Sequence, residues 1–285
     1  MDEGALARLV GHPFPGGRYL VAHWENWLLT DCAGRAPMAD DLVHPIVLFH
    51  APILGAGTSI AELFRLGQAS CAGGSVGLLG YDWEYLEPIR EDLDYQVEGA
   101  IISAERSTSA SGAVDDHVAF RIELSLGGTP VARVTNRWRF RRRAPSNTNR
   151  AVTSPTRPSV AASELPVWAM TSVDPARMKT MAALLRDPYP VHWDRLANER
   201  SGLGARVLNQ GPLNLAYIAN MLMAWAGDAA IRRLTVTFGR PVLDGDHVIA
   251  GGRVTGVSNG IAHCEVWLAL GDETVVSGTA DVVAP

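Results

Sequence analysis

Alternation between hydrophobic and polar positions dominates the last part of the chain. Four segments rich in valine, isoleucine and threonine follow one another there, separated by glycine turns: 234–238, 247–257, 261–270 and 273–283. Short runs of this kind, broken by glycine, are typical of antiparallel strands. We therefore expect these segments to form a sheet.

A different pattern precedes these strands. In PLNLAYIANMLMAWAG, residues 212–227, the only polar side chains are Asn214, Tyr217 and Asn220. A helix that is apolar on nearly every side has to be buried. Gly211 and Pro212 favour a helix start at this point, because proline fits the first helical turn.

The first half of the chain repeats this order less regularly. Its helix is expected to begin near Ser59, where Ser59 and Glu62 form a capping-box pattern, and to end near Leu66. Strands are expected within 74–88, in the nineties, within 118–126 and within 129–140. Segment 85–99 aligns with 238–252, and segment 124–135 aligns with 268–279. This repetition indicates a duplicated domain rather than a solenoid of many short repeats.

One buried helix wrapped by a curved antiparallel sheet is the hot-dog architecture, so the predicted fold class is α+β, a double hot dog. Residues 144–163 are rich in proline, serine and threonine and poor in large apolar side chains, which predicts a linker. The expected division is therefore an N-terminal repeat over 1–143, this linker, and a C-terminal repeat over 164–285.

The composition fits a soluble globular protein. Of the 285 residues, 47% are hydrophobic and 19% are charged, and the formal charge of −5 includes no block that suggests a nucleic acid partner. We expect no membrane segment and no signal peptide. The three cysteines, Cys32, Cys71 and Cys264, lie far apart without a CxxC pair. We therefore expect neither a disulfide framework nor a zinc site, and a cytoplasmic location.

One short stretch carries candidate chemistry. In RDPYPVHWD, residues 186–194, Asp187 and His192 flank a turn that Pro188 and Pro190 stiffen. An imidazole is suited to proton transfer near neutral pH. A carboxyl group beside it can hold a water molecule or, when protonated, donate to a leaving oxygen. We expect the turn to hold both groups toward one substrate.

This stretch, followed by QGPL (210–213) at the start of the buried helix, resembles the MaoC-like (R)-specific enoyl-thioester hydratases and dehydratases. Their motif is Gly-Asp-x-Asn-Pro-[Leu/Ile/Val]-His, and the positions that match it in register are Asp187, Pro190, Val191 and His192. Arg186 replaces the glycine, and Tyr189 replaces the asparagine. The resemblance implies a hydro-lyase that interconverts 3-hydroxyacyl and trans-2-enoyl thioesters of coenzyme A or of an acyl carrier protein.

The resemblance also implies a role for each site residue. His192 is expected to act as general base toward the α-carbon, and Asp187 to handle the β-hydroxyl or the attacking water. The Gly211 amide at the helix N-terminus is expected to donate to the thioester oxygen. Substrate contacts are expected from Tyr189, Gln210, Pro212 and His50. No metal or redox cofactor is expected, because the pantetheine carrier is part of the substrate.

The first repeat is expected to lack the catalytic pair. Aligning HAP (50–52) with QGP (210–212) places Trp27 opposite Asp187 and Cys32 opposite His192. Tryptophan and cysteine could not carry out this acid–base chemistry together. We therefore expect one active site per chain, at the junction of the halves, with the first repeat lining the acyl tunnel. Such a chain can be a monomer or a homodimer.

Other interpretations stay open. The motif can be an ordinary capped turn with a surface histidine. The chain can isomerise or cyclise a tethered polyketide-like substrate, an option that Tyr189 supports, or it can be a non-catalytic acyl-binding subunit. A thioesterase is a further alternative, although residues 212–227 contain no Asp or Glu. The basic run RWRFRRR (137–143) fits either a phosphate or acidic-carrier contact or the solvated end of a strand.

Overall fold

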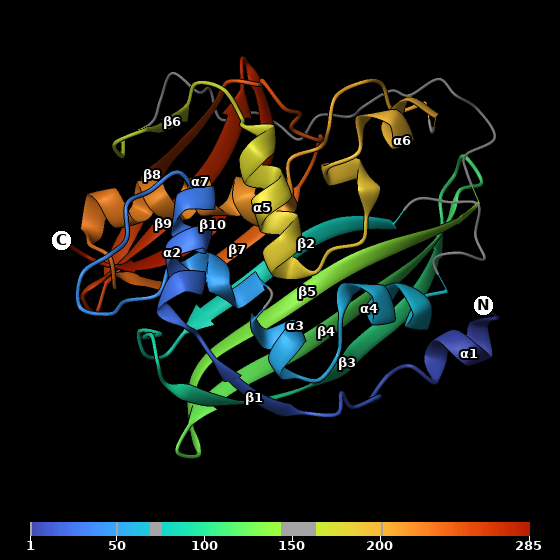
Figure 1. The fold of residues 1–285 in the computed structure, drawn as a ribbon, viewed down its shortest axis with the longest axis horizontal. Coiled ribbons are helices and arrows are strands. Elements are labelled where there is room, and N and C mark those ends of the chain that lie inside the picture. The colour runs from blue at the N-terminus through green and yellow to red at the C-terminus, as the bar shows by residue number, and fades with distance from the viewer. Residues whose placement is uncertain (1, 50, 69–75, 144–163, 201) are drawn as a thin grey trace.

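The computed structural model describes residues 2–49, 51–68, 76–143, 164–200 and 202–285. In this part of the chain, the strands form one antiparallel sheet in the order β1-β3-β4-β5-β2-β7-β10-β9-β8-β6 (Figure 1). Their bounds are β1 (Gly17–Leu20), β2 (Val76–Tyr85), β3 (Asp94–Thr108), β4 (Val114–Leu126), β5 (Thr129–Arg143), β6 (Trp168–Met170), β7 (Ile231–Phe238), β8 (Val248–Ser258), β9 (Ile261–Leu270) and β10 (Glu273–Val283).

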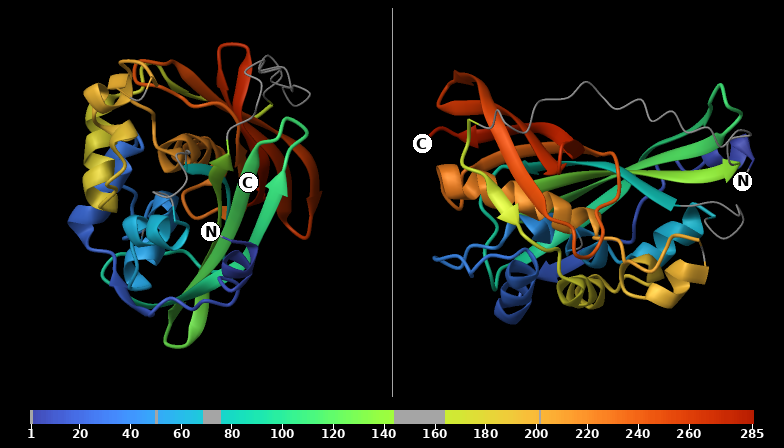
Figure 2. Two further views of the ribbon diagram at one scale, coloured as in Figure 1. Left: turned by 90° about the vertical axis from the view of Figure 1, so that its right-hand side faces the viewer. Right: turned by 90° about the horizontal axis from the view of Figure 1, so that it is seen from above.

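The helices α2, α4, α5, α6 and α7 lie on one side of this curved sheet (Figure 2). Two short turns of 3-10 helix, η1 and η4, lie among them. The bounds are α1 (Glu3–Ala7), α2 (His23–Cys32), η1 (Pro45–Phe49), α3 (Ala51–Gly55), α4 (Ile60–Leu66), α5 (Pro175–Leu185), η4 (Pro190–His192), α6 (Arg195–Arg200) and α7 (Gly211–Ala226). Among the described residues, no helix has the length and apolar character needed to span a bilayer.

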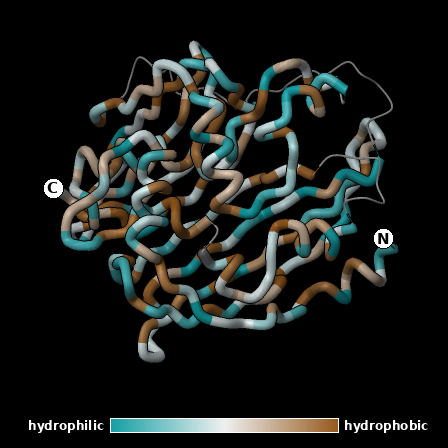
Figure 3. The backbone as a smooth tube through the Cα atoms, in the orientation of Figure 1, coloured by the Kyte–Doolittle hydropathy of each residue, from teal (hydrophilic) through white to brown (hydrophobic). Residues whose placement is uncertain are grey.

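The strand order is symmetric about its centre. The first half contributes β1-β3-β4-β5-β2, and the second half contributes β7-β10-β9-β8-β6, which is the same order read from the opposite edge. The expected strands at 247–257, 261–270 and 273–283 are β8, β9 and β10 and are confirmed. Hydrophobic and hydrophilic residues alternate along the strands (Figure 3), because one face of the sheet packs on the helices.

The two halves meet at the β2–β7 pair. Tyr81 lies opposite Val236, and Asp82 lies opposite Thr235. On the outer face, the Asp82 carboxylate accepts hydrogen bonds from the Arg233 guanidinium at 2.9 and 2.6 Å and from the Thr235 hydroxyl at 2.9 Å. The main-chain ladder and this ion pair therefore join the repeats into one continuous sheet.

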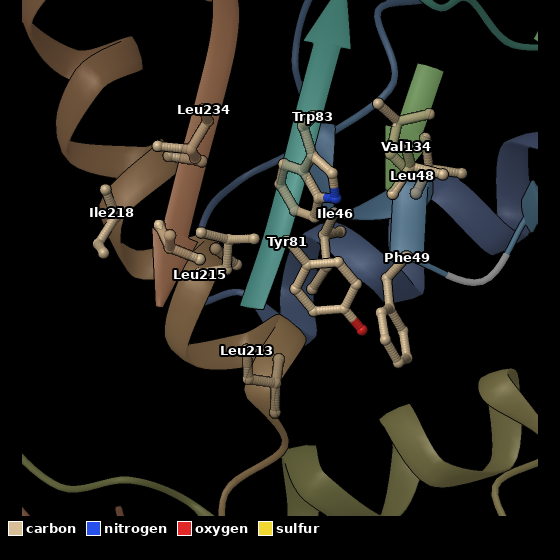
Figure 4. Close-up of a cluster of buried hydrophobic side chains, with 14 of the residues drawn as sticks. Ile46, Leu48, Phe49, Tyr81, Trp83, Val134, Leu213, Leu215, Ile218 and Leu234 are labelled. Atoms are coloured by element: carbon tan, nitrogen blue, oxygen red, sulfur yellow. The ribbon is translucent and has the colours of Figure 1, made fainter. Parts of the chain in front are cut away.

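The helix expected over 212–227 is α7, and its burial is confirmed. Its residues from Pro212 to Met223 are all buried. Figure 4 shows Leu213, Leu215 and Ile218 of α7 close to β2 and β7. Each such side chain contributes roughly 1.5–3 kcal/mol when it leaves water, so this helix is a main source of stability.

The buried polar residues of α7 connect the two halves. The Asn220 amide donates to the Ala33 carbonyl at 2.8 Å, and its oxygen lies 2.9 Å from His44 Nε2. The Asn209 amide donates to Asn214 Oδ1 at 2.7 Å. A buried polar group is tolerated when it is hydrogen-bonded in this way.

The helix expected from near Ser59 to near Leu66 is α4 and is confirmed. A further short helix, α3, precedes it and was not predicted; the chain turns between the two at Gly57, whose φ of +72° favours glycine. The predicted start of α4 is confirmed, since Ser59 Oγ accepts from the Glu62 amide at 3.1 Å. The Glu62 side chain pairs with Arg65 instead of closing a capping box.

The proposed linker, 144–163, lies outside the described residues, as does Cys71. The domain boundaries placed around the linker stay a prediction. Cys32 and Cys264 are free and buried.

Candidate active site

The candidate turn follows directly on α5. The chain leaves the helix through Arg186, whose φ of 50° is left-handed. A glycine is favoured in this conformation, which gives a physical reason for the glycine of the motif that Arg186 replaces. Asp187 then accepts the Tyr189 amide on its Oδ1 at 2.9 Å. The sequence suggested no regular element within this stretch, but Pro190–His192 form the 3-10 turn η4.

The structure brings Asp187 and His192 together. Asp187 Oδ2 lies 3.8 Å from His192 Nε2, and the side chains are 7% and 16% exposed. This distance is too long for a hydrogen bond, so the groups face each other without being tied together. The other ring nitrogen, Nδ1, lies 2.8 Å from the Leu208 carbonyl. A carbonyl only accepts, so Nδ1 carries the proton and the Nε2 lone pair faces Asp187.

Burial moves the two titrating groups toward their neutral forms. It raises the pKa of Asp187, while the His192 charge and the Tyr189 amide act in the opposite direction. It lowers the pKa of His192, while Asp187 and the Leu208 carbonyl oppose the shift. Removing water disfavours each charged form. Burial therefore favours a neutral imidazole and a protonated carboxyl group, the forms in which the two groups serve as base and acid.

Backbone contacts hold the His192 turn. The Leu208 amide donates to the Val191 carbonyl at 2.9 Å, so Leu208 contacts the turn through both its amide and its carbonyl. The Asn198 amide donates to the carbonyls of Val191 and Arg206, at 3.0 Å each. Asp194 accepts the Ala197 amide at 3.0 Å and begins α6. The imidazole is therefore held by α6 and by the segment that leads into α7.

Gly211 is the first residue of α7, as predicted, and the helix start has no side-chain cap. The first amides of a helix lack partners within it, so they are available donors. A Cβ on Gly211 would lie 2.5 Å from Leu78 Cδ2 and 3.2 Å from Phe238 Cζ. Glycine thus lets the side chains of β2 and β7 pack closely against the helix start.

The other predicted contact residues differ in position. Tyr189 is half-buried, and its ring centroid lies 6.0 Å from that of His192. Gln210 is buried, and its amide donates to the Met178 carbonyl at 2.8 Å. Pro212 is buried in the first turn of α7. His50 lies outside the described residues.

The first half contributes residues beside this turn. The Phe64 ring of α4 packs edge-on against Tyr189, with centroids 5.6 Å apart, and against Trp138, at 5.3 Å. Tyr81 of β2 is close enough to Asp187 for the carboxylate to help raise the pKa of its phenol. Contacts from both halves therefore surround the Asp187–His192 pair.

The expected correspondence of Trp27 with Asp187 and of Cys32 with His192 is wrong. Both residues lie in α2, which follows β1 as α5 follows β6, so the counterpart of α2 is α5 and not the turn after it. Trp27 is 47% exposed. His44 lies in the segment after α2, but Ile46 N donates to its Nδ1 and its Nε2 faces Asn220. Both ring nitrogens of His44 are therefore already engaged.

Three features of the site were not predicted from the sequence. The Leu208 carbonyl is a backbone group, which no motif can identify. Asn198 lies in an ordinary helical pattern. Tyr81 had a usable signal, because Tyr81, Trp83 and Tyr85 alternate along one strand and share its buried face.

The basic run at 137–143 lies along β5 and is largely paired. Arg141 binds Asp115 at 2.8 Å, and Arg142 binds Asp116 at 2.6 Å. Arg143 donates to the Gly112 carbonyl at 2.8 Å. These contacts favour the interpretation of this basic run as the end of a strand over a contact with phosphate or an acidic carrier.

Comparisons with known proteins match the second half of the chain by sequence and nearly the whole chain by structure. A family model described as "MaoC like domain" matches residues 151–270. A solved MaoC-like dehydratase is 17% identical, with a TM-score of 0.72, and the match covers 98% of this chain and 100% of that one. A MaoC-like dehydratase from Phytophthora capsici is 12% identical, with a TM-score of 0.70 and coverage of 100% and 99%.

A conserved hypothetical protein from Mycobacterium tuberculosis, described as having a double hot-dog fold, is 13% identical, with a TM-score of 0.58 and coverage of 96% of both chains. At these identities the solved structures show the fold alone. No curated protein sequence matches the chain. The predicted fold class is confirmed. Residues 151–270 match the model of the MaoC-like domain, and the chain has the double hot-dog fold.

Proposed function

We propose that this protein is an acyl-thioester dehydratase or hydratase that interconverts 3-hydroxyacyl and trans-2-enoyl thioesters. One observation carries the proposal: a buried carboxyl group and an imidazole face each other at 3.8 Å, and the imidazole is held by the segment that leads into the uncapped start of α7. The thioester is delivered on coenzyme A or on an acyl carrier protein.

In the dehydration direction, His192 Nε2 removes the α-proton of the 3-hydroxyacyl thioester. Negative charge then builds on the thioester oxygen, where the Gly211 amide donates a hydrogen bond, a contribution of about 3 kcal/mol in comparable oxyanion sites. The C3–O bond breaks as Asp187 gives its proton to the departing hydroxyl, which leaves as water. The imidazolium and the carboxylate reset when a proton returns from His192 to Asp187.

The acyl chain is proposed to extend into the first half. A small apolar cavity there, of about 10 Å³, is lined by residues of α4 and of the inner sheet face, including Leu63, Leu66, Phe120, Trp138 and Phe140. This volume holds about one water molecule, so the lining side chains would have to move apart to admit an acyl chain. Phe64 connects this region to the active-site turn, since its ring contacts both Tyr189 and Trp138. An apolar lining suits an alkyl chain.

The test is turnover of synthetic thioesters of pantetheine and coenzyme A. Enoyl absorbance and free thiol are followed together for the wild-type protein, Asp187→Asn and His192→Ala. Loss of general acid or base catalysis is expected to lower kcat by about 10²–10⁴-fold in each variant. Asp272→Asn and His247→Ala, at exposed positions, serve as matched controls and should keep wild-type rates.

Each alternative predicts a different result. Release of thiol without a change in enoyl absorbance identifies a thioesterase. An enoyl product with a shifted double bond, or a cyclised product, identifies a repurposed enzyme. A wild-type protein that binds these thioesters but converts none of them contradicts the proposal and favours the acyl-binding subunit.

A further inference from the structure

The hydroxyl of Tyr81 is a buried donor without a partner. Tyr81 lies on β2 and is 0% exposed, and among the described residues its oxygen has no hydrogen-bond partner. Figure 4 shows the ring projecting from β2 beside Phe49, with the oxygen at the end remote from the strand. Burying a hydroxyl without a hydrogen-bond partner costs free energy. A native protein retains such a group most often where a ligand or a water molecule forms the missing hydrogen bond.

Its neighbour on the same face is paired. Tyr85 is two positions along β2, and its hydroxyl donates to the Pro45 carbonyl at 2.9 Å. Some buried indole nitrogens, such as Trp83 Nε1, also lack a partner. Tyr81 differs from Trp83 because its hydroxyl lies within electrostatic reach of Asp187.

Two ring contacts hold the side chain of Tyr81. The ring packs edge-on against Phe49, with centroids 5.2 Å apart, and against Phe238, at 5.9 Å. Phe238 in turn lies close to Gly211, since a Cβ atom added to Gly211 would be 3.2 Å from Phe238 Cζ. The Tyr81 ring is thus held near the start of α7 by Phe238, and its phenol lies within electrostatic reach of Asp187. Burial, with a smaller contribution from Asp187, raises the pKa of Tyr81 well above its usual value, so the phenol stays a neutral donor.

We propose that the Tyr81 hydroxyl donates a hydrogen bond to the C3 oxygen of the bound thioester, the same oxygen that Asp187 protonates. This inference rests on the proposed dehydratase function. Tyr81 keeps its own proton throughout: it fixes the C3 oxygen while the C3–O bond breaks and the Asp187 proton moves to the leaving water. It therefore selects substrates with oxygen at C3 over saturated acyl thioesters, and the first repeat supplies a polar group to the reaction.

The test compares Tyr81→Phe with Tyr85→Phe, two removals of one hydroxyl from the same strand face. Three quantities are measured for each protein: the melting temperature, the dehydration rate, and the affinities for 3-hydroxybutyryl- and butyryl-pantetheine. Tyr81→Phe should leave the melting temperature unchanged or higher, because no protein hydrogen bond is lost. It should lower kcat/KM by about tenfold or more and reduce the preference for the 3-hydroxy ligand by about tenfold, the equivalent of one hydrogen bond.

Tyr85→Phe should change stability and leave ligand preference unchanged. Its melting temperature should fall, because the Pro45 carbonyl loses its donor, and its ligand preference should stay at the wild-type value. A Tyr81→Phe variant with wild-type kcat/KM and wild-type ligand preference overturns the inference, while a dead Asp187→Asn variant in the same assay leaves the proposed function standing. Equal loss of melting temperature in both tyrosine variants also overturns it, because it assigns Tyr81 a structural role. A wild-type protein that dehydrates none of the thioesters refutes the proposed function and this inference together.

Discussion

His44 should make the folded protein sensitive to acid. Its side chain is 0% exposed. Ile46 N donates to Nδ1 at 3.1 Å, and Nε2 faces the Asn220 oxygen at 2.9 Å. A second proton on the ring would face the Ile46 N–H, which has no lone pair to accept it. Burial lowers the pKa of His44 to about 4, although the Asn220 hydrogen bond opposes the shift.

This shift corresponds to a loss of stability on the acid side. The unfolded chain takes up the His44 proton near its ordinary pKa of about 6.5, whereas the folded protein takes it up only near pH 4. Between these values the unfolded state binds more protons, so stability falls as the pH falls and levels off below about 4. A difference of about 2.5 units at 1.36 kcal/mol per unit gives a loss of about 3 kcal/mol. The group is fully buried, so solvent screening does not reduce this figure.

The assay is urea unfolding of the wild-type protein and of His44→Gln at several values between pH 7.5 and pH 4.5. Glutamine does not titrate but keeps an amide donor for Asn220. The wild-type free energy of unfolding should fall across this range by roughly 2–3 kcal/mol more than that of the variant. His247→Ala, at an exposed position, controls for loss of a histidine as such and should follow the wild-type curve. Parallel curves for wild type and His44→Gln would falsify the reasoning.

Three further predictions concern the site. In Asp187→Asn, the residual activity should not show the fall with rising pH that follows loss of the Asp187 proton in the wild type, because burial raises the pKa of Asp187 and the asparagine amide cannot ionise; a wild-type fall in the variant would contradict the role of Asp187 as the acid. Asn198→Asp should lower kcat by about tenfold or more with little change in KM. The reason is that the Asn198 amide donates to the carbonyls of Val191 and Arg206, whereas a carboxylate cannot donate. Unchanged steady-state kinetics would show that Asn198 does not hold the turn. Leu66→Trp should raise KM for long acyl thioesters but not for butyryl derivatives, because Leu66 lines the apolar cavity; equal effects on both chain lengths would place the acyl chain elsewhere.

Much of the fold was predictable because its signals are local. The α7 sequence has three polar side chains in sixteen residues, and only a buried helix accommodates such a segment. In the first half, the signal at Ser59 was local as well and predicted α4, whereas α3 was missed, because its five residues are too few to show a helical pattern. The Trp27–Cys32 alignment failed for a related reason. It was anchored on helix starts, whereas the segments between α2 and α3 and between α5 and α7 differ in length and in elements.

The site was predictable where the chain itself brings the groups together. Asp187 and His192 are close in sequence, and the prolines between them limit how far apart they can lie. Tyr81 and Phe64 approach the pair only through tertiary packing, across the β2–β7 seam and from α4. A single sequence carries no local signal for such contacts.

The continuous sheet gives a physical reason why both halves of the chain are retained. Without the first half, β7 would be an open edge strand, which favours pairing with other chains. The Asn220 amide in the middle of α7 would lose the Ala33 carbonyl and the His44 ring, the contacts that satisfy it. The start of α7 would also lose Leu78, which covers Gly211. The second half therefore depends on the first to close its sheet, to satisfy its central helix and to keep water from the Asp187–His192 pair.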